Sequence, residues 1–140
     1  MTAAMYPALF FTVALLVTTA YFVMGSAPLL ILKHDTPLDS SFIRSFFNTY
    51  YQAAMFVATA TSVSYAFAGR PMFAIGAAAL AVLAAILRAK VIGRMDRLRA
   101  QMQADHTGAS SRFRITHVTA TLINLMQLMV IVWGLTSLSL

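Results

Sequence analysis

The sequence has no cysteine, no glutamate and little charge of either sign. Without cysteine, the chain cannot form disulfides, thiolate metal sites, iron–sulfur clusters or thiol nucleophiles. Charged residues make up 10% of the 140 residues, against roughly 25% in an ordinary soluble domain. A disordered chain combines low hydrophobicity with high charge, whereas 60% of these residues are hydrophobic. These scarcities argue against disordered and soluble globular proteins and favour an integral membrane protein.

Four apolar segments are present, and each is long enough to cross a bilayer, which takes about 20 residues. They predict an all-α fold, a four-helix membrane bundle made of one transmembrane domain. The third segment is expected to continue as an amphipathic helix to residue 103, because apolar residues recur there at spacings of three and four. That extension would lie beyond the bilayer on the cytoplasmic side. We place the spans at about residues 6–32, 42–67, 71–87 and 113–138.

The first apolar segment is interpreted as a retained span. Residues 1–6 carry no Lys or Arg, whereas a secretory signal peptide has a positive start. Gly, Ser, Ala and Pro occupy positions 25–28, in the last third of the segment. Proline removes a backbone donor and clashes with the preceding turn. A kink or break is therefore predicted at positions 25–28.

The Lys and Arg residues are distributed unevenly along the chain. Nine of the ten lie in or beside the connections that follow the first and third segments, and Arg70 alone lies on the other side. Basic residues mark cytoplasmic loops, so we expect a multi-pass inner-membrane protein with both termini on the non-cytoplasmic side. The basic stretch 88–99 favours contact with anionic membrane lipids. It lacks interleaved aromatic residues and lies beside spans, so nucleic-acid binding is not expected.

Polar residues inside the second and fourth segments form the candidate site, because such residues face other helices or a cavity. Arg44, Asn48 and Gln52 are spaced by four and share a helical face. Gln52 lies about 12 Å beyond Arg44, and Asn124 lies at a similar depth in the last segment, about 15 Å from its basic start. Interhelical packing and snorkelling of Arg44 are the competing interpretations. The candidate ligand-binding residues are Arg44, Asn48, Tyr51, Gln52, His117 and Asn124.

No cofactor or metal is expected from the motifs. The pairs 34–35 and 105–106 combine His with Asp in cytoplasmic connections, but their spacing is not that of a metal site. A haem held by two histidines would need a second intramembrane His opposite His117, and the segments contain none. Hydrolase elbows, phosphate-binding loops and dinucleotide fingerprints are also missing.

Several motifs together resemble a known family. They are the 25–28 element, the aromatic-rich stretch 46–51, the basic stretch 94–99 and the stretch 112–117, with Asn124 seven residues after His117. This pattern resembles the small four-span membrane family related to transmembrane protein 205, whose last helix opens with a basic–aromatic–His element followed by an Asn. It is also similar to the anthrone-oxygenase-like integral membrane family. The first resemblance implies no defined activity, and the second implies cofactor-independent oxygenation of aromatic polyketides.

Three classes of function stay open, and the sequence does not decide whether the protein is an enzyme. The first is a non-catalytic accessory protein that binds a hydrophobic ligand, such as a quinone or lipid, in a polar pocket of the cytoplasmic half. There Arg44 and His117 would meet the polar end of the ligand. The second is a packing subunit of a larger membrane complex or homo-oligomer, joined through the Ala-rich third segment. The third is an oxygenase with His117 as its catalytic base.

Overall fold

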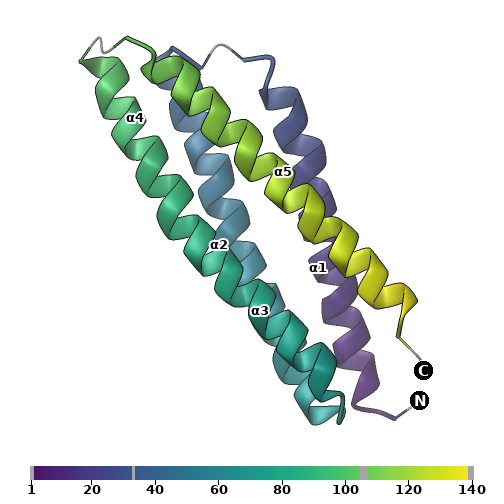
Figure 1. The fold of residues 1–140 in the computed structure, drawn as a ribbon. Coiled ribbons are helices and arrows are strands. Elements are labelled where there is room, and N and C mark those ends of the chain that lie inside the picture. Colours follow the sequence, from purple (N-terminus) through teal and green to yellow (C-terminus); the bar gives the residue numbers. More distant parts are fainter. Residues whose placement is uncertain (1, 33, 105–106, 139–140) are drawn as a thin grey trace.

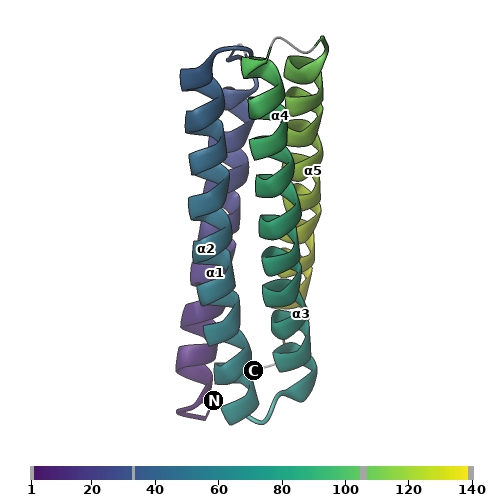
Figure 2. The ribbon, with the colours of Figure 1, turned by 90° about the vertical axis from the view of Figure 1, so that its left-hand side faces the viewer.

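The computed structural model describes residues 2–32, 34–104 and 107–138. Within these ranges every regular element is helical, which confirms the all-α expectation (Figure 1). Four long helical rods lie side by side (Figure 2). The elements are α1 (Met5–Leu29), α2 (Pro37–Phe67), α3 (Pro71–Leu87), the π-helical turn η1 (Arg88–Ile92), α4 (Gly93–Gln103) and α5 (Ala109–Thr136).

The third rod consists of α3, η1 and α4, which follow one another without interruption over 33 residues. The predicted continuation of this helix to residue 103 is therefore confirmed. Its last third does not leave the bundle, because α4 packs against α5 and α2 (Figure 2). The position of α4 relative to a bilayer stays a prediction.

The rods are antiparallel to their chain neighbours, so the two ends of the bundle differ. Both termini and the α2–α3 turn lie at one end, here called the terminal end (Figures 1 and 2). The α1–α2 and α4–α5 connections lie at the other, the loop end. At the terminal end, Gly69 adopts a φ of 70°, which glycine reaches at no steric cost. Pro71 then starts α3, where its missing N–H costs nothing.

Three helices are long and apolar enough to cross a membrane: Met5–Leu29, Pro71–Gln103 and Ala109–Thr136. These three helices identify the protein as membrane-embedded. The remaining rod, α2, is not among them, although it has 31 residues. Many of its polar groups are hydroxyls already bonded inside the helix. Thr59 donates to the Met55 carbonyl at 2.7 Å and Thr61 to the Val57 carbonyl at 2.8 Å, which lowers the cost of placing them in lipid.

The helix ends differ in part from the sequence expectation. α2 begins at Pro37 rather than at about 42, because the Thr36 hydroxyl accepts the Asp39 N–H at 3.2 Å as an N-cap. α1 runs uninterrupted to Leu29, so the break expected at 25–28 is absent. Gly25 instead gives room to α2, since a Cβ there would lie 2.8 Å from the ring of Phe46. Pro28 has no N–H to donate to the Met24 carbonyl, and α1 ends one residue later, at Leu29.

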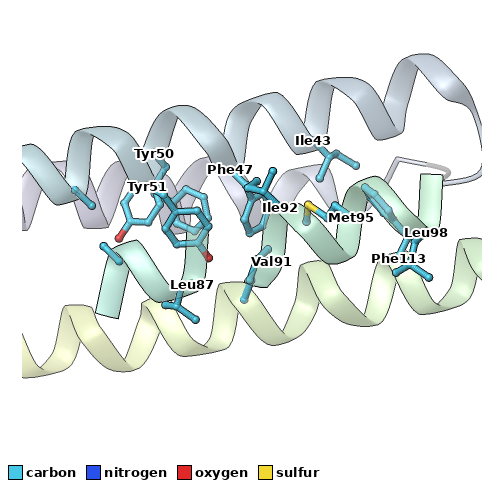
Figure 3. Close-up of a cluster of buried hydrophobic side chains, with 14 residues drawn as sticks. Ile43, Phe47, Tyr50, Tyr51, Leu87, Val91, Ile92, Met95, Leu98 and Phe113 are labelled. Carbon is cyan, nitrogen blue, oxygen red and sulfur yellow. The ribbon is translucent and has the colours of Figure 1, made fainter. Parts of the chain in front are cut away.

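The main core fills the half of the bundle nearer the loop end (Figure 3). Phe22 of α1 packs on a row of α2 aromatics, with its ring centroid 3.9 Å from Tyr50 and 4.9 Å from Phe47. From the third rod, η1 contributes the adjacent residues Val91 and Ile92, which are both buried. A π-helical turn adds one residue per turn, so two consecutive side chains reach the core there.

Candidate functional site

A buried polar network surrounds His117, where α5 crosses the end of α1. His117 is 0% exposed. Its Nε2 lies 3.1 Å from the Ser26 carbonyl oxygen and 3.0 Å from the Ser26 hydroxyl. Its Nδ1 lies 2.9 Å from Nε2 of His34, in the α1–α2 connection. The ring of Phe47 meets the imidazole edge-on, with centroids 5.1 Å apart.

The end of α1 explains why His117 bonds there. The chain tightens after Pro28, and the Leu30 N–H bonds the Ala27 carbonyl at 3.1 Å. The Ser26 carbonyl therefore lacks its usual helical partner, as carbonyls in a last turn do. His117 supplies the missing donor. One turn earlier in α5, Arg114 donates to the Leu30 carbonyl at 2.8 Å, so two side chains of α5 cap α1.

The acceptors fix the direction of each hydrogen bond. A carbonyl only accepts, so the proton of His117 lies on Nε2 and faces Ser26. Nδ1 of His117 is then an acceptor for the Nε2–H of His34. Thr121 donates to the His117 carbonyl at 2.9 Å, so the Ser26 hydroxyl donates to Thr121 across 2.6 Å. With two neutral imidazoles, the contact between His34 and His117 has one donor and one acceptor, whereas Nδ1 of His34 is buried without a hydrogen-bond partner among the described residues.

Protonation of this pair is limited by its geometry. With both imidazoles doubly protonated, two N–H groups would point at each other across 2.9 Å. The pKa of His34 is lowered from its usual 6.5, chiefly by burial and also by nearby Arg114, while the Leu32 carbonyl, Asp39 and Asp35 act in the opposite direction. The two nitrogens lie at hydrogen-bond distance, 2.9 Å, which is closer than the roughly 3.3 Å between two nitrogen ligands of a tetrahedral metal.

Metal and haem sites are not supported elsewhere in the described residues, where no group of three or more His, Cys, Asp or Glu could hold an ion. His34 does lie opposite His117, a partner that the sequence did not reveal. The two rings contact each other directly, with centroids 5.2 Å apart, so no macrocycle fits between them. Asp105 and His106 lie outside the described residues.

The structure brings three of the six candidate residues together in the core. Tyr51, His117 and Asn124 are each 0% exposed. Asn124 donates to the Ala120 carbonyl at 2.7 Å, while its Oδ1 and the Tyr51 hydroxyl lack a partner at full hydrogen-bond geometry. The two side chains nevertheless lie close enough to interact.

The other three candidates face away from this core. Arg44 makes a two-pronged ion pair with Asp96 of α4, at 2.9 Å and 3.2 Å. Asn48 accepts a hydrogen bond from the Arg88 guanidinium at 3.0 Å. Gln52 is exposed. Arg44 and Asn48 thus join α2 to the third rod, and the six residues line no common space.

Ser26, His34 and Thr121 were missing from the candidate site. Ser26 belongs to the 25–28 element, which the sequence presented only as a backbone irregularity. His34 lies in a connection, and no periodicity places a connection against a helix. The sequence feature that could have revealed this contact is the pair of donors Arg114 and His117, which lie three residues apart in α5. They form a pattern able to cap the carbonyls of a neighbouring helix.

A cavity of about 330 Å³ lies at the terminal end, away from His117. It lies between α3 and α5, which make few contacts with each other, and α1 and α2 supply the rest of its wall. Its wall is almost entirely apolar. The polar side chains of the wall are Ser137, whose hydroxyl donates to the Trp133 carbonyl, and a hydroxyl pair, Thr12 and Tyr65, 3.0 Å apart. Other lining residues include Leu15, Gly76, Leu80, Ile131, Trp133 and Gly134.

Two further hollows lie nearer the loop end. An open hollow of about 510 Å³ is lined by His34, Asp35, Ser110 and Arg114, so the histidine pair lies just beneath a polar surface. The second is a groove of about 200 Å³ between the third rod and α5, lined partly by Lys90 and Arg94.

Comparisons with protein-family models, with curated proteins and with solved structures gave no match.

Proposed function

We propose that all four rods cross the inner membrane, with the loop end in the cytoplasm. An even number of crossings agrees with both termini lying at one end (Figure 1). Because α2 lies beside three membrane-spanning helices and packs most against α3 and α1, it would enter the bilayer with them. Of the nine basic residues that the structure describes, all except Arg70 lie toward the loop end, which supports this orientation.

We further propose that the protein is a non-catalytic accessory protein that binds a hydrophobic ligand of quinone or lipid type. The apolar cavity at the terminal end is the observation that carries this proposal. Ligand pockets combine an apolar wall with a few placed polar groups. By contrast, His117 and Asn124 have no accessible surface, so a ligand could reach them only after the core opened.

The hydroxyl pair gives the cavity a polar contact. Thr12 donates to the Ala8 carbonyl at 2.7 Å and to the Tyr65 hydroxyl oxygen at 3.0 Å. The Tyr65 hydroxyl keeps its own proton and a second lone pair for a ligand. A ligand with a hydroxyl on an apolar body, such as a quinol or a lipid alcohol, fits this wall. Trp133, which is 71% exposed, adds an aromatic face.

The alternative functions have weaker support in the geometry. The packing-subunit proposal depended on small residues in the third segment. Ala77 and Ala84 are buried within this chain, where α3 packs closely on α2. Gly76 is exposed, and Ala81 and Ala85 are half-buried, so only part of this small-residue surface is free for a partner. An oxygenase using His117 would need a route for the substrate to a side chain without accessible surface.

The test uses fluorescence of Trp133, the single tryptophan of the chain, with decylubiquinone as the probe. Gly76 lines the cavity, and a Cβ placed there meets no atom within 4 Å. Gly76→Leu should therefore fill the cavity without a clash, while Leu favours the helix by up to about 1 kcal/mol over Gly. The apparent affinity for decylubiquinone, obtained from saturable quenching in nanodiscs, should fall at least tenfold in this variant.

Gly93→Leu is the matched control, because Gly93 is also helical and open but does not line the cavity. It should quench as the unaltered protein does. Quenching that rises linearly with probe, or that is equal in both variants, would mean nonspecific partitioning and would refute the quinone proposal. Native mass spectrometry of the membrane-purified protein then identifies a retained lipid or quinone.

A further inference from the structure

The groove between the third rod and α5 changes character along its length. Lys90 and Arg94 line it toward the loop end together with Ile115, and Ile123 lines it toward the terminal end, where no charged residue lines it. Val91, Thr116 and Ala120 are its buried lining residues, exposed by only 9%, 7% and 1%. A groove with positive charge at one end and an apolar surface at the other matches a molecule with an anionic head and a hydrocarbon tail.

The two cations are free for such a head. Within the described part of the chain, neither Lys90 nor Arg94 has a hydrogen-bond or ion-pair partner, whereas Arg44, Arg88 and Arg99 are all bonded. Both free side chains are exposed. No acidic residue lines the groove. The charge of the groove is therefore uncompensated by the protein.

A free hydroxyl lies between the two ends of the groove. Threonines in these helices usually donate to the carbonyl four residues earlier, as Thr116 does to Arg112 at 3.0 Å. Thr119 lines the groove and makes no such bond among the described residues. Its hydroxyl can therefore donate to a phosphate or ester oxygen.

The position of the groove along the helices agrees with the level of the lipid headgroups. From Pro71 at the terminal end, Lys90 lies about 28 Å along the third rod and Arg94 about 34 Å. From Trp133, Thr116 lies about 25 Å along α5. The hydrocarbon core of a bilayer is about 30 Å thick. If Pro71 and Trp133 lie at one interface of the membrane, both helices place this groove among the lipid headgroups of the opposite interface.

We propose that this groove binds one anionic glycerophospholipid, with its phosphate between Lys90 and Arg94 and an acyl chain along Ile123. The π-helical turn η1 belongs to the site, because it shifts Lys90 and Arg94 relative to a regular helix. Such turns occur often at functional sites. The apolar half of the groove would have no occupant if the ligand were a soluble phosphate. The site is separate from the cavity proposed for the hydrophobic ligand.

The test measures lipid retention by native mass spectrometry, with the protein in nanodiscs of equal phosphatidylglycerol and phosphatidylcholine. The unaltered protein should keep one phosphatidylglycerol in preference to phosphatidylcholine. Arg94→Gln and Lys90→Gln should each lower that preference about fivefold, which corresponds to about 1 kcal/mol per basic residue at the membrane surface. Thr119→Val should lower it less, because it removes one hydroxyl and no charge.

Arg97→Gln is the matched control, because Arg97 is exposed on the same helix but does not line the groove. It should keep the preference of the unaltered protein. An equal loss in Arg97→Gln would mean diffuse attraction and would refute a defined site, as would the absence of any preference. Release of the lipid by millimolar glycerol 3-phosphate would assign the groove to a soluble phosphate instead.

Discussion

The two halves of the bundle are packed in opposite ways. The half nearer the loop end contains the aromatic core and the histidine network, and α5 packs closely on α4 there. The half nearer the terminal end has two small clusters, one around Tyr65 and one around Leu15. There α3 and α5 make few contacts and leave the apolar cavity between them.

This difference shows that intramembrane polar residues do not mark the accessible space in this protein. His117, Ser26 and Thr121 use their hydrogen-bonding capacity on one another and on the end of α1. The cavity arises instead where side chains are small or missing, as at Gly76 and Gly134. Polar groups specify how the helices pack, and small residues set where the packing is incomplete.

The largest expected contrast between the two ends is their exposure to opposite sides of the membrane. Because the chain has no cysteine, one introduced thiol can be labelled without background. Thr2→Cys, at the terminal end, should react almost completely with a membrane-impermeant maleimide in intact spheroplasts. Ser111→Cys, at the loop end, should react only after permeabilisation. The reverse pattern would invert the proposed orientation, and labelling of both would exclude four crossings.

The second contrast is the energetic cost of truncating a side chain in each half. Phe47 is 0% exposed, so Phe47→Ala leaves a void that the core cannot easily fill. We expect it to lower the free energy of unfolding by roughly 3 kcal/mol. Leu80 already borders the cavity, so Leu80→Ala should cost less than half as much. Reversible unfolding in mixed micelles, followed by circular dichroism, measures both.

Phe56→Ala controls for loss of an aromatic ring without loss of core packing. Phe56 lies on the same helix as Phe47 but is 72% exposed. Its substitution should change the free energy of unfolding by less than about 0.5 kcal/mol. Equal costs for Phe47→Ala and Leu80→Ala would contradict the difference in packing between the halves.

Periodicity and hydropathy predicted the helices well, because these depend on local spacing and length. The predicted apolar stripe consists of Val91, Met95, Leu98 and Met102. The first three are buried, and Met102 is partly buried against the same core. The candidate site was less predictable, because the rotation of each helix about its axis decides which of its residues face the site. The shared face of Arg44 and Asn48 was correctly inferred, but that face meets Asp96 and Arg88 instead of α5.

Ser26 and His34 could not be assigned to the network by spacing alone. Their contact with His117 needs α1 to end three residues after Ser26, so that the Ser26 carbonyl lacks its helical N–H partner. It also needs the α1–α2 connection to fold back over the bundle. Neither feature has a period in the sequence. Gly25 was similarly ambiguous, since glycine suits both a break and a close helix contact. Only the position of Phe46 distinguishes the two.

The smallest predicted effect tests whether the loop-end network depends on a neutral His34. Burial holds the pKa of His34 below 6.5, so the unfolded chain binds this proton more readily than the folded protein does. Stability should therefore be greatest above pH 6.5 and fall as the pH drops below it. His34→Gln keeps a hydrogen-bond donor but does not titrate, so it should flatten the decline between pH 7.5 and 5. Unfolding in mixed micelles at each pH measures this slope, and an unchanged slope in His34→Gln would assign the titration to another group.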